Sequence, residues 1–236
     1  MTLEPGSVDI IQLAWARHLG LDDGAFAAAA GERITRADAA AGTVQFVRLF
    51  GSSALVGPQW ALDAAAKLSD GELAQHVTLL TITRQHGGHG LGAAALFFAD
   101  DLALQQPAEE LTVSHGTPEA LELEAACPPD DVNEVGLSGL EHRFTILHEE
   151  DGRRTPVACG AYTEWEGIIA QMGVLVAPQW RRCGLGSLAA SIAAHEALAS
   201  GLTLQWRSDV SNQGSLAIAR SLGFSAGGIQ TSVLLG

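Results

Sequence analysis

The chain of 236 residues is poor in lysine, cysteine and tyrosine. Lys67 is its only lysine, against twelve arginines, and it has a single tyrosine. Its three cysteines, Cys127, Cys159 and Cys183, are odd in number and far apart in the sequence. They do not form the even, closely spaced set that characterises small disulfide-bonded secreted domains. We therefore expect no disulfide framework and a reducing compartment.

Positive charge is also scarce. Lysine and arginine together number 13, against 27 acidic residues, which gives a formal net charge of −14. Such a chain repels nucleic acid and anionic membrane surfaces. We expect neither as a partner, and the acidic balance favours a cationic one.

Long apolar runs are missing, although 47% of the residues are hydrophobic. The longest such run, residues 93–99, is far too short to span a bilayer. The N-terminal residues show no basic segment followed by an apolar core, so we expect no secretory signal. The composition is sufficient for a substantial core and predicts a folded protein with a cytoplasmic location.

The most informative stretch is residues 174–186, Val-Leu-Val-Ala-Pro-Gln-Trp-Arg-Arg-Cys-Gly-Leu-Gly. Residues 174–176 predict a buried strand, which Pro178 ends because proline has no N–H for a β-ladder. A basic, glycine-containing turn follows, and then an alanine-rich helical pattern. A helix start with unpaired N–H groups and nearby glycines is suited to binding phosphate. We call residues 181–186 the cradle.

Around the cradle, hydrophobic patterning predicts three antiparallel strands, then helix, strand, helix and strand. The expected strands cover residues 142–148, 156–162, 168–176, 202–206 and 230–235, and the expected helices cover 184–200 and 212–222. A charged turn, residues 149–154, joins the first two strands, and residues 164–167 form the turn into the third.

The first half is less regular. Its expected helices are residues 7–20, 59–68, 70–80 with Asp70 as cap, and 117–126 with Thr117 as cap; its expected strands are 43–50, 54–56 and 93–99. Residues 84–92 predict a glycine-rich loop, and residues 100–116 a polar connection. Pro128 and Pro129 end the helix that begins at Thr117. His86 and His89 lack a nearby third ligand, so we expect no metal site.

Residues 181–224 carry a family resemblance. Arg181-x-x-Gly184-x-Gly186 resembles the Gln/Arg-x-x-Gly-x-Gly/Ala signature of the GNAT superfamily, the acyl-CoA-dependent N-acetyltransferases. Asn212-x-x-Ser215, which leads to Leu-Gly-Phe at residues 222–224, is similar to its second motif. The expected order of elements over residues 143–236 also fits. The resemblance implies a mixed α+β fold, with a central, mostly antiparallel sheet, splayed strands and flanking helices.

The resemblance also implies acetyl-CoA as co-substrate. It places the pantetheine arm along the strand at residues 174–176 and the pyrophosphate on the cradle. The cofactor-binding residues implied are Val174, Leu175, Val176, Arg181, Arg182, Cys183, Gly184, Leu185, Gly186, Ser187, Asn212 and Ser215. Asn212 has a second possible role as a helix cap.

Acetyl transfer to a primary amine needs a base, because an ammonium group must first lose its proton. Glu164 is our candidate, with Glu166 behind it, and both are also interpretable as solvated turn charges. The family's usual tyrosine acid corresponds to Ala219 here, so Tyr162 is the remaining candidate acid. The expected acceptor is a small-molecule or peptide amine. A non-catalytic acyl-CoA-binding regulatory module is the competing hypothesis.

The sequence predicts two regions: residues 1–89, an α/β extension of open role, and residues 90–236, the acetyl-CoA-binding domain. Leu-Val-Gly-Pro-Gln-Trp at residues 55–60 echoes Leu-Val-Ala-Pro-Gln-Trp at residues 175–180. The extension is therefore a candidate degenerate second copy of the domain. It could equally serve as an acceptor lid or as a homodimer surface.

Overall fold

A computed structural model describes residues 3–29, 31–103 and 112–236. The predicted polar connection at 100–116 falls partly outside these ranges. The chain divides into two compact units. The first, here the cradle unit, consists mainly of Phe98–Trp206 and Ala217–Ser225. The second unit consists of Glu4–Phe97, Arg207–Leu216 and Ala226–Gly236.

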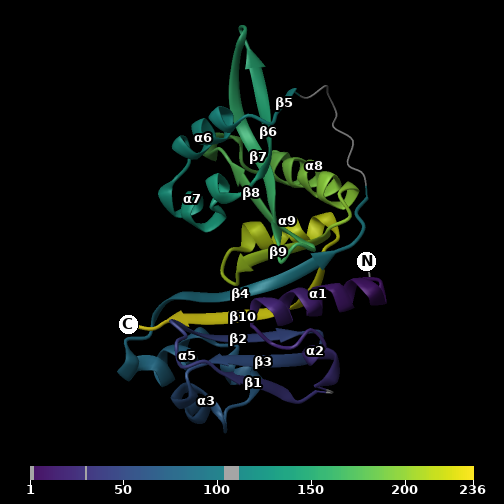
Figure 1. Ribbon diagram of the computed structural model, residues 1–236. Coiled ribbons are helices and arrows are strands. Elements are labelled where there is room, and N and C mark those ends of the chain that lie inside the picture. Colours follow the sequence, from purple (N-terminus) through teal and green to yellow (C-terminus); the bar gives the residue numbers. More distant parts are fainter. Residues whose placement is uncertain (1–2, 30, 104–111) are drawn as a thin grey trace. The chain divides into compact units, whose positions relative to one another are not determined.

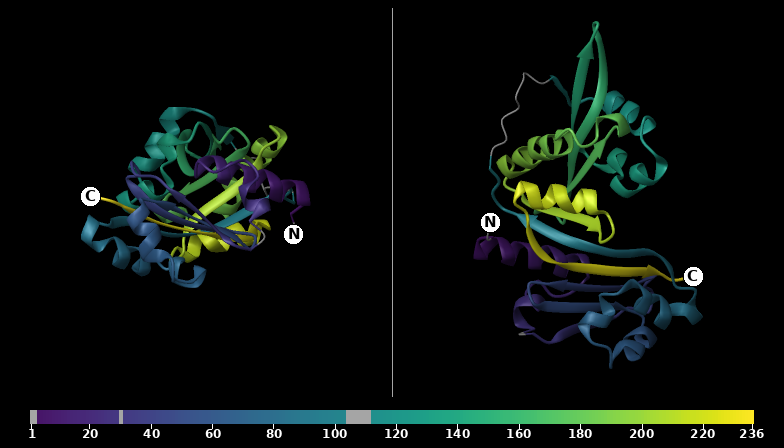
Figure 2. Two further views of the ribbon diagram at one scale, coloured as in Figure 1. Left: turned by 60° about the horizontal axis from the view of Figure 1, so that its bottom comes forward. Right: turned by 180° about the vertical axis from the view of Figure 1, so that it is seen from behind.

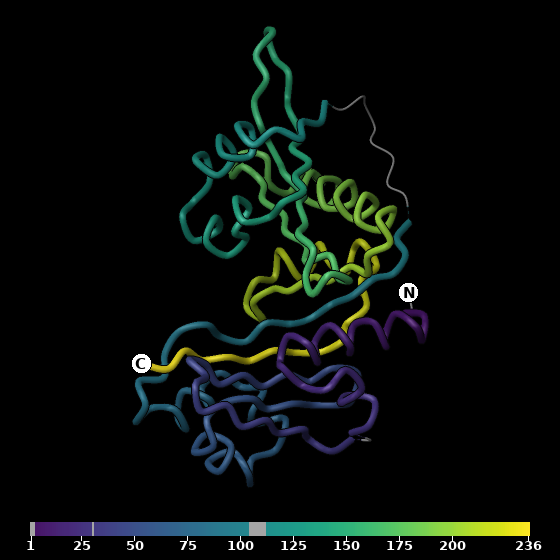
Figure 3. Tube along the Cα trace, viewed as in Figure 1, coloured from purple at the N-terminus to yellow at the C-terminus, as the bar shows by residue number. Residues whose placement is uncertain are grey.

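The cradle unit is built on a sheet with the strand order β5–β6–β7–β8–β9 (Figure 1). The strands are β5 (Thr112–Ser114), β6 (His142–Glu150), β7 (Arg153–Trp165), β8 (Ile169–Val176) and β9 (Thr203–Asp209). Neighbours from β5 to β8 are antiparallel, and β8 and β9 are parallel. The predicted three-stranded meander is confirmed. β6 and β7 form a long hairpin that turns at Asp151 and Gly152 and is easily followed in the tube trace (Figure 3).

Helices cover both faces of this sheet. α6 (Thr117–Ala125) and α7 (Pro129–Val135) pack on one face, where Leu123 of α6 and Val135 of α7 belong to the same apolar cluster as Leu175 of β8. α8 (Leu185–Ala199) packs on the other face, as Figure 2 shows from behind. Gly160 of β7 permits this close approach, because a Cβ there would lie 1.9 Å from the carbonyl oxygen of Ala189. The predicted helix–sheet layers are confirmed.

Two predictions about α6 and its surroundings are wrong. The N-cap of α6 is Gly116, and Thr117 is already helical. The prolines after α6 do more than end it: Pro129 opens α7, a helix that the sequence did not predict. Proline suits the first helical position because its missing N–H would have no acceptor there, and Asp130 and Asp131 favour the positive helix end.

The second unit carries the strand order β1–β3–β2–β10–β4. Its strands are β1 (Arg33–Ala37), β2 (Thr43–Leu49), β3 (Ser52–Gly57), β4 (His89–Ala99) and β10 (Ser225–Leu234), and its helices are α1 (Pro5–His18), α2 (Ala25–Ala28), α3 (Gln59–Ala65), α4 (Asp70–Leu73) and α5 (His76–Thr83). β2 pairs antiparallel with both β3 and β10, and β1 runs parallel to β3. α9 (Gln213–Leu222) is shared between the units.

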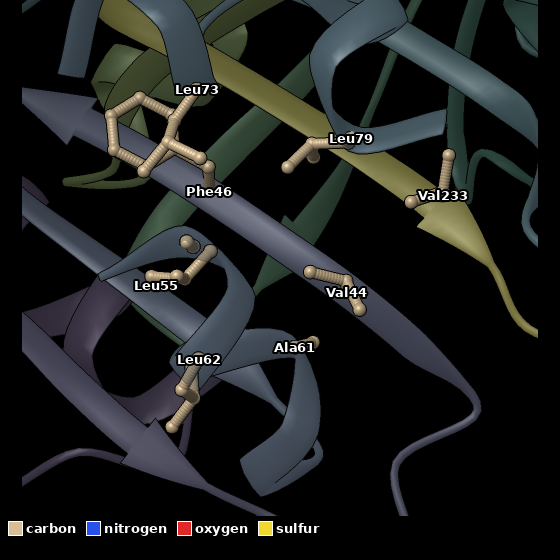
Figure 4. Close-up of a cluster of buried hydrophobic side chains, with 9 residues drawn as sticks. Val44, Phe46, Leu55, Ala61, Leu62, Leu73, Leu79 and Val233 are labelled. Atoms are coloured by element: carbon tan, nitrogen blue, oxygen red, sulfur yellow. The ribbon is translucent and has the colours of Figure 1, made fainter. Parts of the chain in front are cut away.

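A buried apolar cluster packs three helices against the sheet of this second unit (Figure 4). Phe46 of β2, Leu55 of β3 and Val233 of β10 meet α3, α4 and α5 in a buried cluster. The predicted helix over residues 70–80 is instead two helices, and Ser69 rather than Asp70 caps the first, through a capping box with Glu72. The predicted loop 84–92 ends early, because β4 already begins at His89.

Candidate active site

The edge of β8 that faces β9 is the centre of the candidate site. Ile168 accepts a hydrogen bond from the Thr203 N–H on that side, whereas the Ala177 N–H donates to Val157 on the β7 side. Peptide groups alternate between the two edges of a strand. The peptide groups that point toward the β9 side are therefore those of Met172, Val174 and Val176, and the peptide group of Leu175 points toward β7.

The pairing of β8 with β9 is short. Its register runs from Ile169 opposite Thr203 to Gln171 opposite Gln205, and the described pairing ends there. The rest of β8, from Met172 onward, pairs with β7. The outward peptide groups of this part of β8 can therefore bind an extended ligand as a neighbouring strand would.

The three predicted strand residues differ in their surroundings. Leu175 is buried against α6 and α7, and its peptide group faces β7. Val174 and Val176 are half-buried against α8. The carbonyl of Val176 accepts bonds from Arg181 Nε, at 3.3 Å, and from Cys127 Sγ, at 3.7 Å. Among the three, Val174 thus offers both its N–H and its C=O on the side of β9.

The cradle follows β8 directly. A 3₁₀ turn, Pro178–Trp180, leads into it, and Gly184 occupies the N-cap of α8 with φ +82°. Arg182 also has a left-handed φ of +62°. Residues 181–184 are exposed, and no side chain caps the helix. The N–H groups of the first turn of α8 therefore face outward beside a positive helix end, a favourable position for an anion.

The two arginines of the cradle are not equivalent. Arg181 forms an ion pair with Asp131 of α7, in addition to its bond to the Val176 carbonyl. This side chain therefore ties the turn to α7 and has part of its charge neutralised. Arg182 is exposed and has no ion pair within the described ranges. Arg182 is thus the better-placed cation for a phosphate.

The remaining cradle residues, together with Ser187 after them, pack the start of α8 against its neighbours. A Cβ on Gly186 would lie 3.0 Å from Ile218 Cδ1 and 3.3 Å from Val176 Cγ2, so glycine allows α8 to pack against the end of β8. Leu185, the first residue of α8, packs against the apolar cluster between α8 and the sheet. The hydroxyl of Ser187 lies 3.4 Å from that of Ser221, and the exposed Cys183 Sγ contacts the Arg181 carbonyl.

Asn212 caps α9, which is one of the two roles predicted for it. Its Oδ1 accepts a hydrogen bond from the Ser215 N–H at 3.0 Å. Asn212 and Ser215 belong to the second unit. Their contact with a cofactor stays a prediction.

The candidate base Glu164 lies within β7, not in the predicted turn. It pairs with Ala170, one residue before the end of the β8–β9 register, and its side chain is exposed. Glu166 lies in the turn that follows, with a left-handed φ of +53°. Glu164 is thus one strand away from the point where β8 loses its partner.

The candidate acid Tyr162 is buried, with 3% of its surface exposed. Its ring stacks on His142 of β6, with 4.4 Å between centroids and 17° between planes. Tyr162 lies two residues before Glu164, and the two side chains share one face of β7. Ala219 of α9, which replaces the family's tyrosine, is fully buried.

Three polar residues of the site escaped the sequence interpretation: Gln171, Gln205 and Asp131. Gln205 is 2% exposed and donates from Nε2 to Gln171 Oε1 at 2.7 Å. Asp131 holds Arg181. The available signal for the first pair was Gln171, a glutamine within the otherwise apolar strand β8. Asp131 gave no signal, because α7 was unexpected.

Burial raises the pKa of Cys127, against an opposing effect of Arg181. Burial also raises the pKa of Cys159, against the opposing effect of a hydrogen bond with Thr145. Neither is therefore a nucleophile at neutral pH.

The two histidines weighed as metal ligands have local partners. His86 stacks on Trp60, and His89 Nδ1 lies 2.8 Å from the Gly87 carbonyl. Over residues 3–29, 31–103 and 112–236, no group of three or more His, Cys, Asp and Glu side chains is arranged to hold a metal ion. The helices in these ranges are also all too short or too polar to cross a bilayer.

Residues 117–224 match the acetyltransferase (GNAT) family. No curated protein matches the chain significantly. Solved structures that resemble it include a putative GNAT acetyltransferase from Novosphingobium aromaticivorans, at 17% identity over 63% of this chain and 67% of that one, with a TM-score of 0.49. A GCN5-related N-acetyltransferase from Kribbella flavida matches at 22% identity over 66% and 63%, with a TM-score of 0.46.

A tandem GNAT protein from the clavulanic acid biosynthesis pathway matches at 14% identity over 65% of this chain and 56% of that one, with a TM-score of 0.44. The chain thus spans less than two thirds of the length of this structure and of the Kribbella one.

Proposed function

We propose that residues 117–224, which match the acetyltransferase (GNAT) family, form an acetyltransferase domain, and that the protein transfers an acetyl group from acetyl-CoA to a primary amine of a small molecule or peptide. GNAT family members use acetyl-CoA as co-substrate. One observation carries the proposal. The open edge of β8, the exposed Arg182 of the cradle and the uncapped start of α8 follow one another directly along the chain.

In this proposal the pyrophosphate of acetyl-CoA binds the first turn of α8. The N–H groups of that turn and the helix dipole stabilise its negative charge, and Arg182 adds a cation. This local positive potential is needed because the chain carries a net charge of −14. Arg181 acts on the turn indirectly, through Asp131 and the Val176 carbonyl.

The pantetheine arm then extends along the β9-facing edge of β8. Its amides pair with the Val174 peptide group in the manner of an added strand. From Val176 to Gln171 is five residues, or about 17 Å at the usual rise of a strand. The thioester thus reaches the point where β8 and β9 begin to pair.

The proposed reaction is direct attack of the acceptor amine on the thioester of acetyl-CoA. The amine nitrogen forms a bond to the thioester carbon, the carbon–sulfur bond breaks, and the CoA thiolate leaves. Glu164 takes one proton from the substrate ammonium so that the neutral amine can attack, because its strand position is one residue from the end of the β8–β9 register. The nitrogen releases its second proton to solvent as the amide forms. Tyr162 is the candidate donor to the thiolate, and Glu166 the reserve base. Residues 90–236 are the proposed functional region, and the protein acts in the cytoplasm.

Binding is tested by the melting temperature with and without millimolar acetyl-CoA, since a ligand that binds only the folded state raises it. Gly184→Asp places a negative charge at the cradle and should abolish the shift. Gly152→Asp is the matched control, because both glycines have positive φ and open space where a Cβ would be. A Gly184→Asp protein that binds acetyl-CoA like the unaltered protein would show that the cradle is not the site.

Turnover is tested by thiol release from acetyl-CoA across a panel of polyamines, aminoglycosides, amino acids and peptides with free N-termini. We expect release above the amine-free rate with at least one class, and a loss of about 10²-fold or more with Glu164→Gln. Binding without release for any amine would identify an acyl-CoA-binding module instead.

A further inference from the structure

β8 and β9 separate at a pair of glutamines. Gln171 and Gln205 form the last register pair between the two strands. The Gln205 side chain donates to Gln171 Oε1 at 2.7 Å, and Gln171 Nε2 donates to the Met172 carbonyl at 3.1 Å. We call this arrangement the glutamine bridge.

The bridge lies on the face of the sheet that carries α6 and α7. Side chains alternate along β8, so Gln171 shares a face with Gly173 and Leu175. Leu175 packs in the cluster under these helices, and a Cβ on Gly173 would lie 2.5 Å from Leu140 Cδ1. Gln205 is on the same face because it pairs with Gln171 in register.

Burying an amide in a strand is costly unless its groups are paired. Gln205 is 2% exposed, and an apolar side chain would serve the core at least as well. The bridge instead ties the two strands together where their pairing ends. Because Gln171 Nε2 also donates to the Met172 carbonyl, the next peptide group of β8 that faces β9 and can bind a ligand is that of Val174.

We infer that the glutamine bridge is the floor of the acyl site and restricts the protein to short acyl groups. The inference rests on the proposed function, which brings the thioester along β8 to this point. A longer acyl chain would have to displace the Gln205 side chain from Gln171. We expect an acetyl group to end before it.

The test compares the affinities of acetyl-CoA, butyryl-CoA and octanoyl-CoA, measured by calorimetry without an acceptor. We expect the unaltered protein to bind acetyl-CoA at least about tenfold more tightly than butyryl-CoA, the usual scale for overfilling a packed site. Gln205→Ala removes the floor and should bring the ratio to about one or invert it. Gln205→Leu keeps the volume and should keep the preference.

Gln59→Ala, at an exposed glutamine of α3, is the control and should leave the ratio unchanged. The ratio within one protein is the readout, so a general loss of stability does not imitate the effect. Gln171→Ala, at a half-buried position, serves if Gln205→Ala fails to fold, and it should also lower the ratio.

The outcomes separate the two claims. Equal binding of acetyl-CoA and butyryl-CoA by the unaltered protein would overturn the inference and leave the proposed function standing. So would an unchanged ratio in both alanine variants. Binding of none of the three would overturn the proposed function itself.

Discussion

At the scale of single residues, burial decides the role of chemically reactive groups in this protein. The cysteine in the cradle, Cys183, is exposed, whereas Cys159 of β7 is fully buried between sheet and helices. The sequence placed Cys183 in the cradle but gave no sign that Cys159 is buried. Only their surroundings distinguish an accessible side chain from one that fills the core.

Cys159 should make the protein less stable in alkali. Burial raises the pKa of this thiol above its value in the unfolded chain, so folding favours the protonated form. That contribution is complete below the unfolded pKa, about 8.5, and is lost as pH rises through the higher folded pKa. Urea unfolding between pH 7.5 and 10.5 should show a falling free energy, with a smaller fall in Cys159→Ala. Cys183→Ala is the control, and an equal fall in all three proteins would refute the assignment.

At the scale of elements, α7 connects to the cradle through one ion pair. Arg181 follows β8, and its guanidinium reaches Asp131 on α7 and the Val176 carbonyl on β8. The turn is thereby fixed from outside its own segment. The sequence motif assigned Arg181 to the cofactor, because a motif cannot show that a nearby helix competes for its charge.

We expect this ion pair to contribute modestly to stability. The side chains of Arg181 and Asp131 are 42% and 36% exposed, and pairs of this kind contribute about 1 kcal/mol or less. A double-mutant cycle with Arg181→Gln and Asp131→Asn, followed by urea unfolding, measures the coupling. The more exposed pair Arg154–Glu149 gives the control cycle, with an expected coupling nearer zero. Coupling no larger than in the control would contradict a fixed turn.

The two similar segments, residues 55–60 and 175–180, begin in strands that also have similar pairing patterns. β3 pairs antiparallel with its hairpin partner β2 and parallel with β1, as β8 pairs with β7 and β9. Both strands lead into Pro-Gln-Trp. A degenerate second copy therefore stays a prediction for residues 1–89, beside a lid and a dimer surface.

At the scale of the whole molecule, the two ends of the sequence contribute to one fold. β10, the last strand, pairs with β2 over seven register positions from Gly228 opposite Leu49 to Leu234 opposite Thr43. Val233 is part of the core of the second unit. The sheet of the first hundred residues is therefore completed by the last dozen.

Val233→Asp should consequently destabilise a region nearly two hundred residues earlier in the chain. The side chain is fully buried, and a carboxylate there has no partner, which costs about 3 kcal/mol or more. Leu234→Asp is the matched control, since the neighbouring side chain is 38% exposed and should cost about 0.5 kcal/mol. Hydrogen exchange of β2 amides should accelerate in the first variant only. Equal exchange in both would show that β10 does not support β2.

The sequence alone determined the elements whose signals are local. Residues 142–176 alternate and turn as a meander, and the cradle lies where a proline ends a strand and glycines open a helix. The family resemblance added acetyl-CoA as the expected co-substrate, and it made the spacing of Arg181, Gly184 and Gly186 a predicted phosphate site. The caps at Ser69 and Gly116 lie one residue before the predicted ones, because local sequence places a helix boundary only to within one or two residues.

Only the tertiary structure decided which side chains are available. It buried Tyr162 against His142, tied Arg181 to Asp131 and joined Gln171 to Gln205 across two strands that are 34 residues apart in the sequence. Each of these contacts depends on strand register and on helix placement. The physical reason is that a motif specifies the local path of the backbone, whereas charge pairing and burial are settled between segments that are distant in the chain.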